Sequence, residues 1–202
     1  AGDVIPEVVE AKTDRRTGTE IPFKMITECP ICHTNLVKIG ADYYCPNKLC
    51  PARNIEGLIH YAAKEAMNIE TMGEEVITDF YNLGFITKIE DFYSLKDHYE
   101  EIILEDGYGK KSVDKMLEMI ERSKHNSLDR LIYALGIPGI GKKKATVLAE
   151  NFHNMDTLEF TSYEVLDSIP DIGDILSQNI IKYFNTHREL IGNLRKIGLN
   201  ME

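Results

Sequence analysis

The residues best suited to chemistry are four cysteines, all between positions 29 and 50 of this 202-residue chain. Cys29 and Cys32 form one close pair, and Cys45 and Cys50 form a second pair after twelve intervening residues. Two such pairs are typical of a tetrahedral zinc site, in which each pair directs two thiolates toward one ion. Because four thiolates leave no position for water, the pattern predicts a structural zinc ion rather than a catalytic one.

Two other interpretations of these thiols are weaker. Two disulfides of a secreted domain would usually be spread along the chain, but no cysteine lies outside this stretch. His33 adjoins Cys32 and could compete as a ligand, but four thiolates already complete the shell, so a solvated His33 is favoured. Reduced thiols also predict a cytoplasmic location.

A second pattern is a repeat built on Gly73, Gly109, Gly141 and Gly173, which are spaced by 36, 32 and 32 residues. The residues four, seven and eight positions after each glycine are mostly apolar, as one buried helix face would be. In that order they are Ile77, Val113, Ala145 and Ser177, then Phe80, Met116, Leu148 and Ile180, then Tyr81, Leu117, Ala149 and Ile181. The repeat predicts four units of helix, tight turn and helix.

The third turn carries the clearest chemistry. Pro138 fits the first central position of a type II turn, and Gly139 fits the second, which requires a positive φ. Gly141 then opens a helix whose free N–H groups and positive dipole end favour an anion such as a nucleic-acid phosphate. Lys142, Lys143 and Lys144 add positive charge at the same place, so we expect this turn to bind DNA.

The four turns differ in their suitability for a phosphate. The second turn resembles the third, with Gly107 and Gly109 followed by Lys110, Lys111 and Ser112. The first has Thr71 at the turn position, where a β-branched side chain disfavours positive φ, and Glu74 and Glu75 after Gly73. The fourth has Asp171 and Asp174 around Gly173. We therefore expect the second and third turns to carry most of the DNA affinity, and the first and fourth to be structural or weaker.

The alternative is that these glycines are ordinary connectors in a helical bundle. A single Gly-x-Gly turn would not exclude that alternative. Four copies in register, two of them followed by lysines, favour DNA binding.

The periodicity of apolar residues supplies the elements that must position these groups. It predicts helices over 54–67, 110–123 and 127–135, and a small hairpin over 36–44 between the cysteine pairs. Strand signals are weak after position 50. The predicted fold is mainly α: a small β-rich four-cysteine zinc ribbon followed by four tandem helix-hairpin-helix units, near residues 70–84, 106–121, 137–152 and 169–184.

Composition and charge narrow the function further. The chain is 43% hydrophobic and 28% charged, which is typical of a soluble globular protein, and no apolar run could span a membrane. Its net charge of −10 argues against a simple polybasic DNA binder. The charge is uneven, however, because residues 107–153 carry a net +4 while residues 57–106 carry −9. We expect the acidic stretch 90–106 to be a solvated face that points away from DNA.

Together these features resemble the C-terminal half of the bacterial NAD-dependent DNA ligases. The resemblance rests on Cys29-Pro-x-Cys32, on Cys45-Pro-Asn-x-x-Cys-Pro-Ala52, and on stretches such as Gly107-x-Gly109-x-Lys111-Ser112 and Ala134-Leu135-Gly136-Ile137. It implies three parts: residues 1–24 as the end of an OB fold and a linker, 25–56 as the zinc finger, and 57–202 as the hairpin domain. In particular, Ala1 to Val9 resemble the last part of the OB fold.

The resemblance also implies a function. Ligases of this family seal nicks in duplex DNA during replication and repair, using NAD and Mg²⁺ and a lysine in a Lys-x-Asp-Gly motif. This chain has no such motif, and we expect from its lack of an initiator Met that it is a fragment or a processed chain. We therefore expect zinc here, but no NAD or Mg²⁺ binding and no ligation without the nucleotidyltransferase and OB-fold domains in cis. The implied partner is nicked duplex DNA, bound by a monomer near the nucleoid.

Two alternatives stay open at this point. A stand-alone DNA-repair or scaffold module could use the same hairpins, and its segment 1–9 would pack as part of a native module. A protein–protein adaptor built on a zinc ribbon would show no salt-dependent DNA binding.

Overall fold

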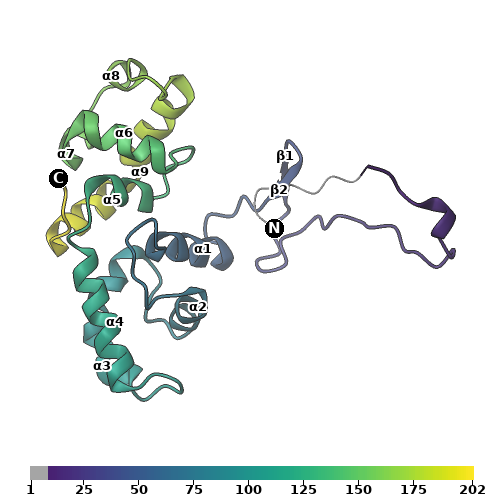
Figure 1. Cartoon of the computed structure of the whole chain (residues 1–202), viewed down its shortest axis with the longest axis horizontal. Helices are drawn as coiled ribbons and strands as arrows, with labels where there is room; N and C mark the ends of the chain where they lie inside the picture. The colour runs from purple at the N-terminus through teal and green to yellow at the C-terminus, as the bar shows by residue number, and fades with distance from the viewer. Residues whose placement is uncertain (1–8) are drawn as a thin grey trace. The chain divides into compact units, whose positions relative to one another are not determined.

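The computed structural model describes residues 9–202. Residues 1–8 of the expected OB-fold segment lie outside the described residues, and so does the question of whether that segment packs. The chain divides into two compact units between Asn47 and Lys48 (Figure 1). In the described part of the chain, no helix is long and apolar enough to cross a membrane.

The first unit is small and has little regular structure. It contains a 3-10 turn, η1 (Thr13–Arg15), and two short strands, β1 (Val37–Ile39) and β2 (Asp42–Tyr44). The strands pair antiparallel, with Val37 opposite Tyr44 and Ile39 opposite Asp42. This hairpin confirms the β element expected between the cysteine pairs. All six strand residues are exposed, so the hairpin has no apolar core of its own.

The second unit is helical and contains the hydrophobic core. Its elements are α1 (Pro51–Ala62), α2 (Glu74–Asn82), η2 (Ile89–His98), α3 (Tyr99–Ile102), α4 (Lys110–Ser123), α5 (Leu128–Ala134), α6 (Lys142–Phe152), α7 (Met155–Glu159), α8 (Tyr163–Asp167) and α9 (Asp174–Ile197). The mainly α fold is therefore confirmed. Buried hydroxyls join three of these elements, since Tyr61 Oη lies 2.7 Å from Tyr93 Oη, which lies 3.4 Å from Ser123 Oγ.

The helix expected over 54–67 is wrong at both ends. α1 starts earlier, at Pro51, a residue that suits the first turn of a helix. It ends at Ala62 because the backbone leaves the helical conformation at Ala63, with φ −54° and ψ 155°. Side chains near and on α5 bind the carbonyls of the segment that follows. Arg130 Nε donates to Ala66 O at 2.8 Å, and Asn126 Nδ2 donates to Met67 O at 2.6 Å. The chain then turns through Asn68, which has a left-handed φ of 52°. These tertiary contacts override the helical periodicity. The helices expected over 110–123 and 127–135 are confirmed as α4 and α5.

The repeated helix face is confirmed in all four copies. The residues four and seven positions after each glycine are buried, and those eight positions after it are half-buried. Ser177 is the one polar member of this set, and its hydroxyl donates to Gly173 O at 3.0 Å, so the buried group has an acceptor. The second helices of the four repeats are α2, α4, α6 and α9.

The repeats associate in pairs. Tyr108 in the second turn donates to Asp79 Oδ2 on α2 at 3.0 Å, which joins the first two repeats. Asn179 Nδ2 on α9 donates to Pro138 O in the third turn at 3.1 Å, which joins the last two. Figure 1 shows α2, α3 and α4 at one end of the helical unit and α6, α7 and α8 at the other. Side-chain hydrogen bonds therefore connect a turn of one repeat to the second helix of its neighbour.

Candidate nucleic-acid interface and metal centre

The four cysteines come together in one cluster. Their Sγ atoms all lie within 4.8 Å of one another, and those of Cys32 and Cys45 are 3.4 Å apart. A disulfide would need about 2.05 Å, so these two thiols are not oxidised to one another. Four sulfurs around one ion, each at about 2.3 Å, would be separated by distances of this order. The cluster therefore fits a structural zinc ion, as the sequence predicts.

The backbone around Cys29 forms the knuckle that aims its thiol. The Cys29 N–H donates to Thr34 O at 2.9 Å, and the His33 N–H donates to Cys29 O at the same distance. His33 takes a left-handed φ of 56° to close this turn, and its side chain is exposed and outside the cluster. On the other side, Cys50 lies directly before α1, where Pro51 starts the helix.

The electrostatics of the knuckle favour a thiolate. The pKa of the Cys32 thiol is lowered to about 5. The main cause is its hydrogen bond with the Thr34 side chain, and the second is its hydrogen bond with the Asn47 side chain. A thiolate is the form in which cysteine binds a metal.

The four hairpin turns share one backbone hydrogen bond. In each turn the N–H of the residue before the helix-opening glycine donates to the carbonyl three residues earlier, at 2.9–3.2 Å. The four pairs are Met72 to Ile69, Tyr108 to Glu105, Ile140 to Ile137 and Ile172 to Ile169. Sequence and structure therefore agree on four equivalent turns, although the side chains around them differ.

The residue that needs a left-handed conformation differs among the turns. Gly107 has φ 88° and Gly139 has φ 81°, as expected for the second and third turns. Asp171 takes the same conformation at φ 71°, which aspartate tolerates better than most residues. Thr71 does not have a positive φ, which agrees with the restriction on its β-branched side chain.

The helix-opening glycines face open space. Gly73, Gly109, Gly141 and Gly173 are the N-caps of their helices, and a Cβ added to any of them would meet no atom within 4 Å. Packing among the described residues therefore does not require a glycine at Gly73, Gly109 or Gly141, whereas the positive φ of 28° favours one at Gly173. Gly139 differs, because its added Cβ would lie 2.6 Å from Leu176 Cδ2 on α9.

The lysines of the second and third turns occupy two kinds of position. Lys110, Lys111, Lys142 and Lys143 are exposed in the first helical turn after their glycines, with no ion pair to any residue in 9–202. Lys144 is half-buried, and its Nζ donates to Gly139 O at 3.4 Å. Among the remaining residues of the second turn, Ser112 Oγ donates to Gly109 O at 2.7 Å. Lys144 and Ser112 thus brace their own turns, while the other four lysines are available to a ligand.

The fourth turn presents carboxylates that are already bound. Asp174 accepts hydrogen bonds from Tyr163 Oη at 2.8 Å and Gln178 Nε2 at 2.6 Å. The bond to Asp174 raises the pKa of Tyr163 to about 12, because ionising the phenol would place two negative charges together. Ile175 follows and is exposed. The first turn likewise presents Glu74 and Glu75 in an exposed position.

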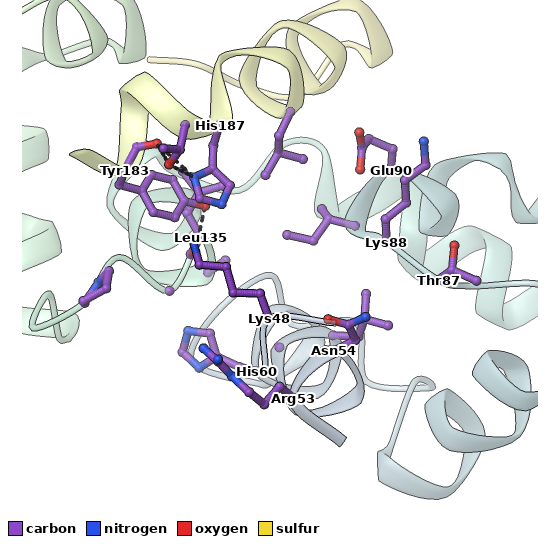
Figure 2. A pocket seen from close by; sticks show the side chains of 18 of the residues that line it. Lys48, Arg53, Asn54, His60, Thr87, Lys88, Glu90, Leu135, Tyr183 and His187 are labelled. Atoms are coloured by element: carbon purple, nitrogen blue, oxygen red, sulfur yellow. Dashed lines mark hydrogen bonds between the residues drawn. The ribbon is translucent and has the colours of Figure 1, made fainter. Parts of the chain in front are cut away.

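One feature of the site has no signal in the sequence. A cleft of about 890 Å³ opens beside the third turn, between α1, the start of η2 and α9. Figure 2 shows Arg53 and His60 on one side of the cleft, Lys88 and Glu90 on a second, and Tyr183 and His187 on a third. Its lining residues are up to 142 positions apart in the chain, so no spacing rule could group them. Glu90 lines this cleft, and Asp91 accepts bonds from the Thr87 and Lys88 N–H groups. Phe92, Tyr93, Leu95 and Ile102 of the same stretch are buried. The expectation that 90–106 is a solvated face is therefore wrong at these four residues and at the half-buried Glu90, and its orientation away from DNA stays a prediction.

Two known families match parts of the chain. Residues 28–52 match the NAD-dependent DNA ligase C4 zinc finger domain, and residues 130–191 match the helix-hairpin-helix motif. The first match contains all four cysteines, and the second contains the third and fourth turns.

Curated relatives match along the whole chain. The DNA ligase of Brevibacillus brevis is 41% identical over 206 residues, and that of Acholeplasma laidlawii is 42% identical over 208 residues. The DNA ligase of Bacillus pumilus is 42% identical over 205 residues. Each alignment covers all of this chain but 30–31% of the relative, so the chain spans about a third of the length of these proteins.

Proposed function

We propose that this chain, which is the zinc-finger and helix-hairpin-helix region of an NAD-dependent DNA ligase, grips nicked duplex DNA through its backbone phosphates. In this proposal the second and third turns bind the DNA. Each offers the N–H groups of a helix start, an open glycine at the N-cap and two exposed lysines. The first and fourth turns close with the same backbone hydrogen bond but present carboxylates, which repel a phosphate, and we assign them a structural role.

The observation that carries the proposal is the open space at Gly109 and Gly141. No atom of the described residues would lie within 4 Å of a Cβ added to these glycines, and Lys110, Lys111, Lys142 and Lys143 follow them without ion pairs to the described residues. Backbone N–H groups and lysines recognise phosphate but not the bases, so the binding is independent of sequence. This independence suits an enzyme that must act at any nick.

The proposal extends to the whole enzyme. We infer that the complete protein joins nicks with NAD and Mg²⁺ in replication and repair, in the bacterial cytoplasm near the nucleoid. The chemistry then belongs to the nucleotidyltransferase and OB-fold domains, and this chain alone does not join ends. Its contribution is to hold the duplex on both sides of the nick.

The test is fluorescence-polarisation binding of the zinc-loaded chain to nicked, intact and single-stranded DNA of two unrelated sequences across a salt series. We expect duplex binding without sequence preference that weakens steeply with salt. The slope of log K against log salt is negative, and its magnitude should fall by about 1.8 in Lys110→Ala/Lys111→Ala and in Lys142→Ala/Lys143→Ala. The reason is that each double variant removes two phosphate contacts.

The matched control is Lys96→Ala/Lys196→Ala, which removes two exposed lysines of η2 and α9 away from every turn. This control should leave both the affinity and the slope unchanged. Equal weakening by all three double variants would mean that only net charge matters and would contradict the proposed contacts. Absence of duplex binding at low salt would contradict the proposed function itself.

For the zinc finger we propose a connecting role between the OB fold and the hairpin domain. The strands of the first unit are exposed and its residues 9–47 form no apolar core, so we expect the metal to supply most of its stability. Chelation of the metal should abolish the near-UV circular dichroism of Tyr43 and Tyr44. The helical far-UV circular dichroism of the second unit should persist. Simultaneous loss of both signals would show that the hairpin domain also depends on zinc.

A further inference from the structure

The cleft beside the third turn concentrates positive charge in an acidic chain. Lys48 and Arg53 line it from the start of α1, Lys88 from the start of η2, and Lys182 from α9. Glu90 is the single carboxylate among its lining residues, and this carboxylate already accepts a bond from Asn193 Nδ2 at 3.1 Å. Lys48, Lys88 and Lys182 form no ion pair with residues 9–202. Cations that face one cleft repel each other unless an anion lies between them.

The shape of the cleft depends on a kink in α9. His187 leaves the helical conformation, with φ −123° and ψ 22°. The Thr186 hydroxyl lies 2.9 Å from Lys182 O and 3.0 Å from Tyr183 O, and His187 Nδ1 lies 2.9 Å from Tyr183 O, so side chains of this turn contact the helix carbonyls at the kink. The His187 ring stacks on Tyr183 with centroids 4.0 Å apart, and Tyr183 Oη donates to Leu135 O at 2.9 Å. These contacts hold one wall of the cleft.

The other lining residues define the ligand further. Leu58, Leu135 and Leu190 give the cleft an apolar part, while Asn54, Asn179 and Thr186 add neutral hydrogen-bonding groups. An apolar surface beside several cations suits a phosphate that carries a sugar or a base, rather than a bare inorganic ion.

We propose that this cleft binds a nucleotide phosphate, with Lys88 and Lys182 as its two anchoring cations. A nucleotide within a DNA strand is the favoured source, because Gly136 and Pro138 of the third turn also line the cleft. A strand held at that turn could therefore continue into the cleft. This form of the inference rests on the proposed function. A free nucleotide is the other source of the same chemistry.

The first arm of the test measures DNA. Lys88→Ala/Lys182→Ala should weaken binding of nicked duplex five- to tenfold and lower the salt slope by about 1.8. Lys96→Ala/Lys196→Ala again serves as the control, because these lysines belong to the same two elements, η2 and α9, and do not line the cleft. It should stay within twofold of the parent.

A variant of opposite sign separates a binding role from a structural one. Glu90→Gln removes the one carboxylate of the cleft and keeps an oxygen that can accept from Asn193. It should tighten DNA binding two- to threefold. A merely structural residue would weaken binding when it is replaced, so this gain cannot come from damage to the fold.

The second arm measures adenosine 5′-monophosphate by calorimetry with the parent and both double variants. Binding that Lys88→Ala/Lys182→Ala removes and the control retains would assign the cleft to a free nucleotide. The inference is overturned if neither DNA nor the mononucleotide distinguishes the cleft variant from the control. Failure of the proposed function is a different result: the parent then binds no duplex, and the mononucleotide arm alone decides the assignment of the cleft.

Discussion

The third and fourth hairpin turns can be compared position by position, because residues 137–141 and 169–173 share an isoleucine, a proline, a second isoleucine and a final glycine. Both turns close with the same backbone hydrogen bond, and both place a left-handed residue after the proline. The two turns therefore share their closing bond and their left-handed residue, but they differ at the final glycine, where φ is −85° at Gly141 and 28° at Gly173.

The side chains around the two turns are opposite in character. Gly139 occupies the left-handed position in the third turn and Asp171 in the fourth. The third turn continues into Lys142 and Lys143, whereas the fourth continues into Asp174 and Ile175. The comparison teaches that the shared turn bond alone does not make a phosphate site, because turns closed in this way can present either cations or a carboxylate that is already bound, as at Asp174.

The largest effect should come from removing the cations of the third turn. Lys142→Ala/Lys143→Ala should weaken duplex binding about twentyfold, or about 1.8 kcal/mol at RT ln 20, because two phosphate contacts are lost. Asp174→Ala/Ile175→Ala changes the same two positions of the fourth turn and should leave the affinity within twofold. Fluorescence polarisation measures both. Equal losses in the two turns would remove the distinction between them.

The next effect concerns how tightly the third turn packs on the helix of the fourth. Gly139→Ala should lower the free energy of unfolding by about 1.5 kcal/mol, because alanine disfavours a φ of 81° and its Cβ would lie 2.6 Å from Leu176 Cδ2. Gly107→Ala has a similar φ of 88° but open space around it, so it isolates the conformational cost. Urea denaturation measures the loss of unfolding free energy in each variant. The difference between the two losses is the contribution of the contact with Leu176. If Gly107→Ala cost as much as Gly139→Ala, the close packing would have no measurable effect.

A gain of binding would sharpen the comparison further. Asp174→Lys/Ile175→Lys gives the fourth turn the pair of cations found in the third. Because Gly173 also opens a helix and leaves open space, duplex affinity should rise about threefold, with a steeper salt dependence. Unchanged affinity in the folded variant would mean that the backbone of the fourth turn, where Gly173 has φ 28°, cannot approach a phosphate.

The smallest effect is the dependence on high pH that Tyr163 of the fourth hairpin contributes. The bond to Asp174 raises the pKa of Tyr163 to about 12, above its ordinary value of 10. The stability that the neutral phenol contributes is therefore complete below pH 10 and is lost as pH rises toward 12. Tyr163→Phe should make the free energy of unfolding fall less between pH 9 and 11 than it does in the parent. An identical fall would show that the bond to Asp174 does not affect stability.

The sequence predicts most of the repeated architecture and both kinds of candidate site. The cysteine spacing predicts the zinc cluster because metal ligation needs only local knuckles and a short hairpin. The spacing of Gly73, Gly109, Gly141 and Gly173 predicts the turns and the buried helix face, because each repeat is formed by neighbouring residues. These features depend on short-range backbone geometry, which local residue types determine.

The tertiary structure decides what happens between distant segments. Beyond Ala62 the chain leaves the helix, and the carbonyls of Ala66 and Met67 are bound by Arg130 and Asn126, which no local signal could reveal. Lys144 braces Gly139 instead of facing a ligand, although it stands in a run of three lysines. The cleft between Lys88 and Lys182 exists only because α9 kinks at His187 and packs near α1 and η2. Local propensity therefore determined the hairpins, whereas long-range hydrogen bonds and packing determined which of their charges meet.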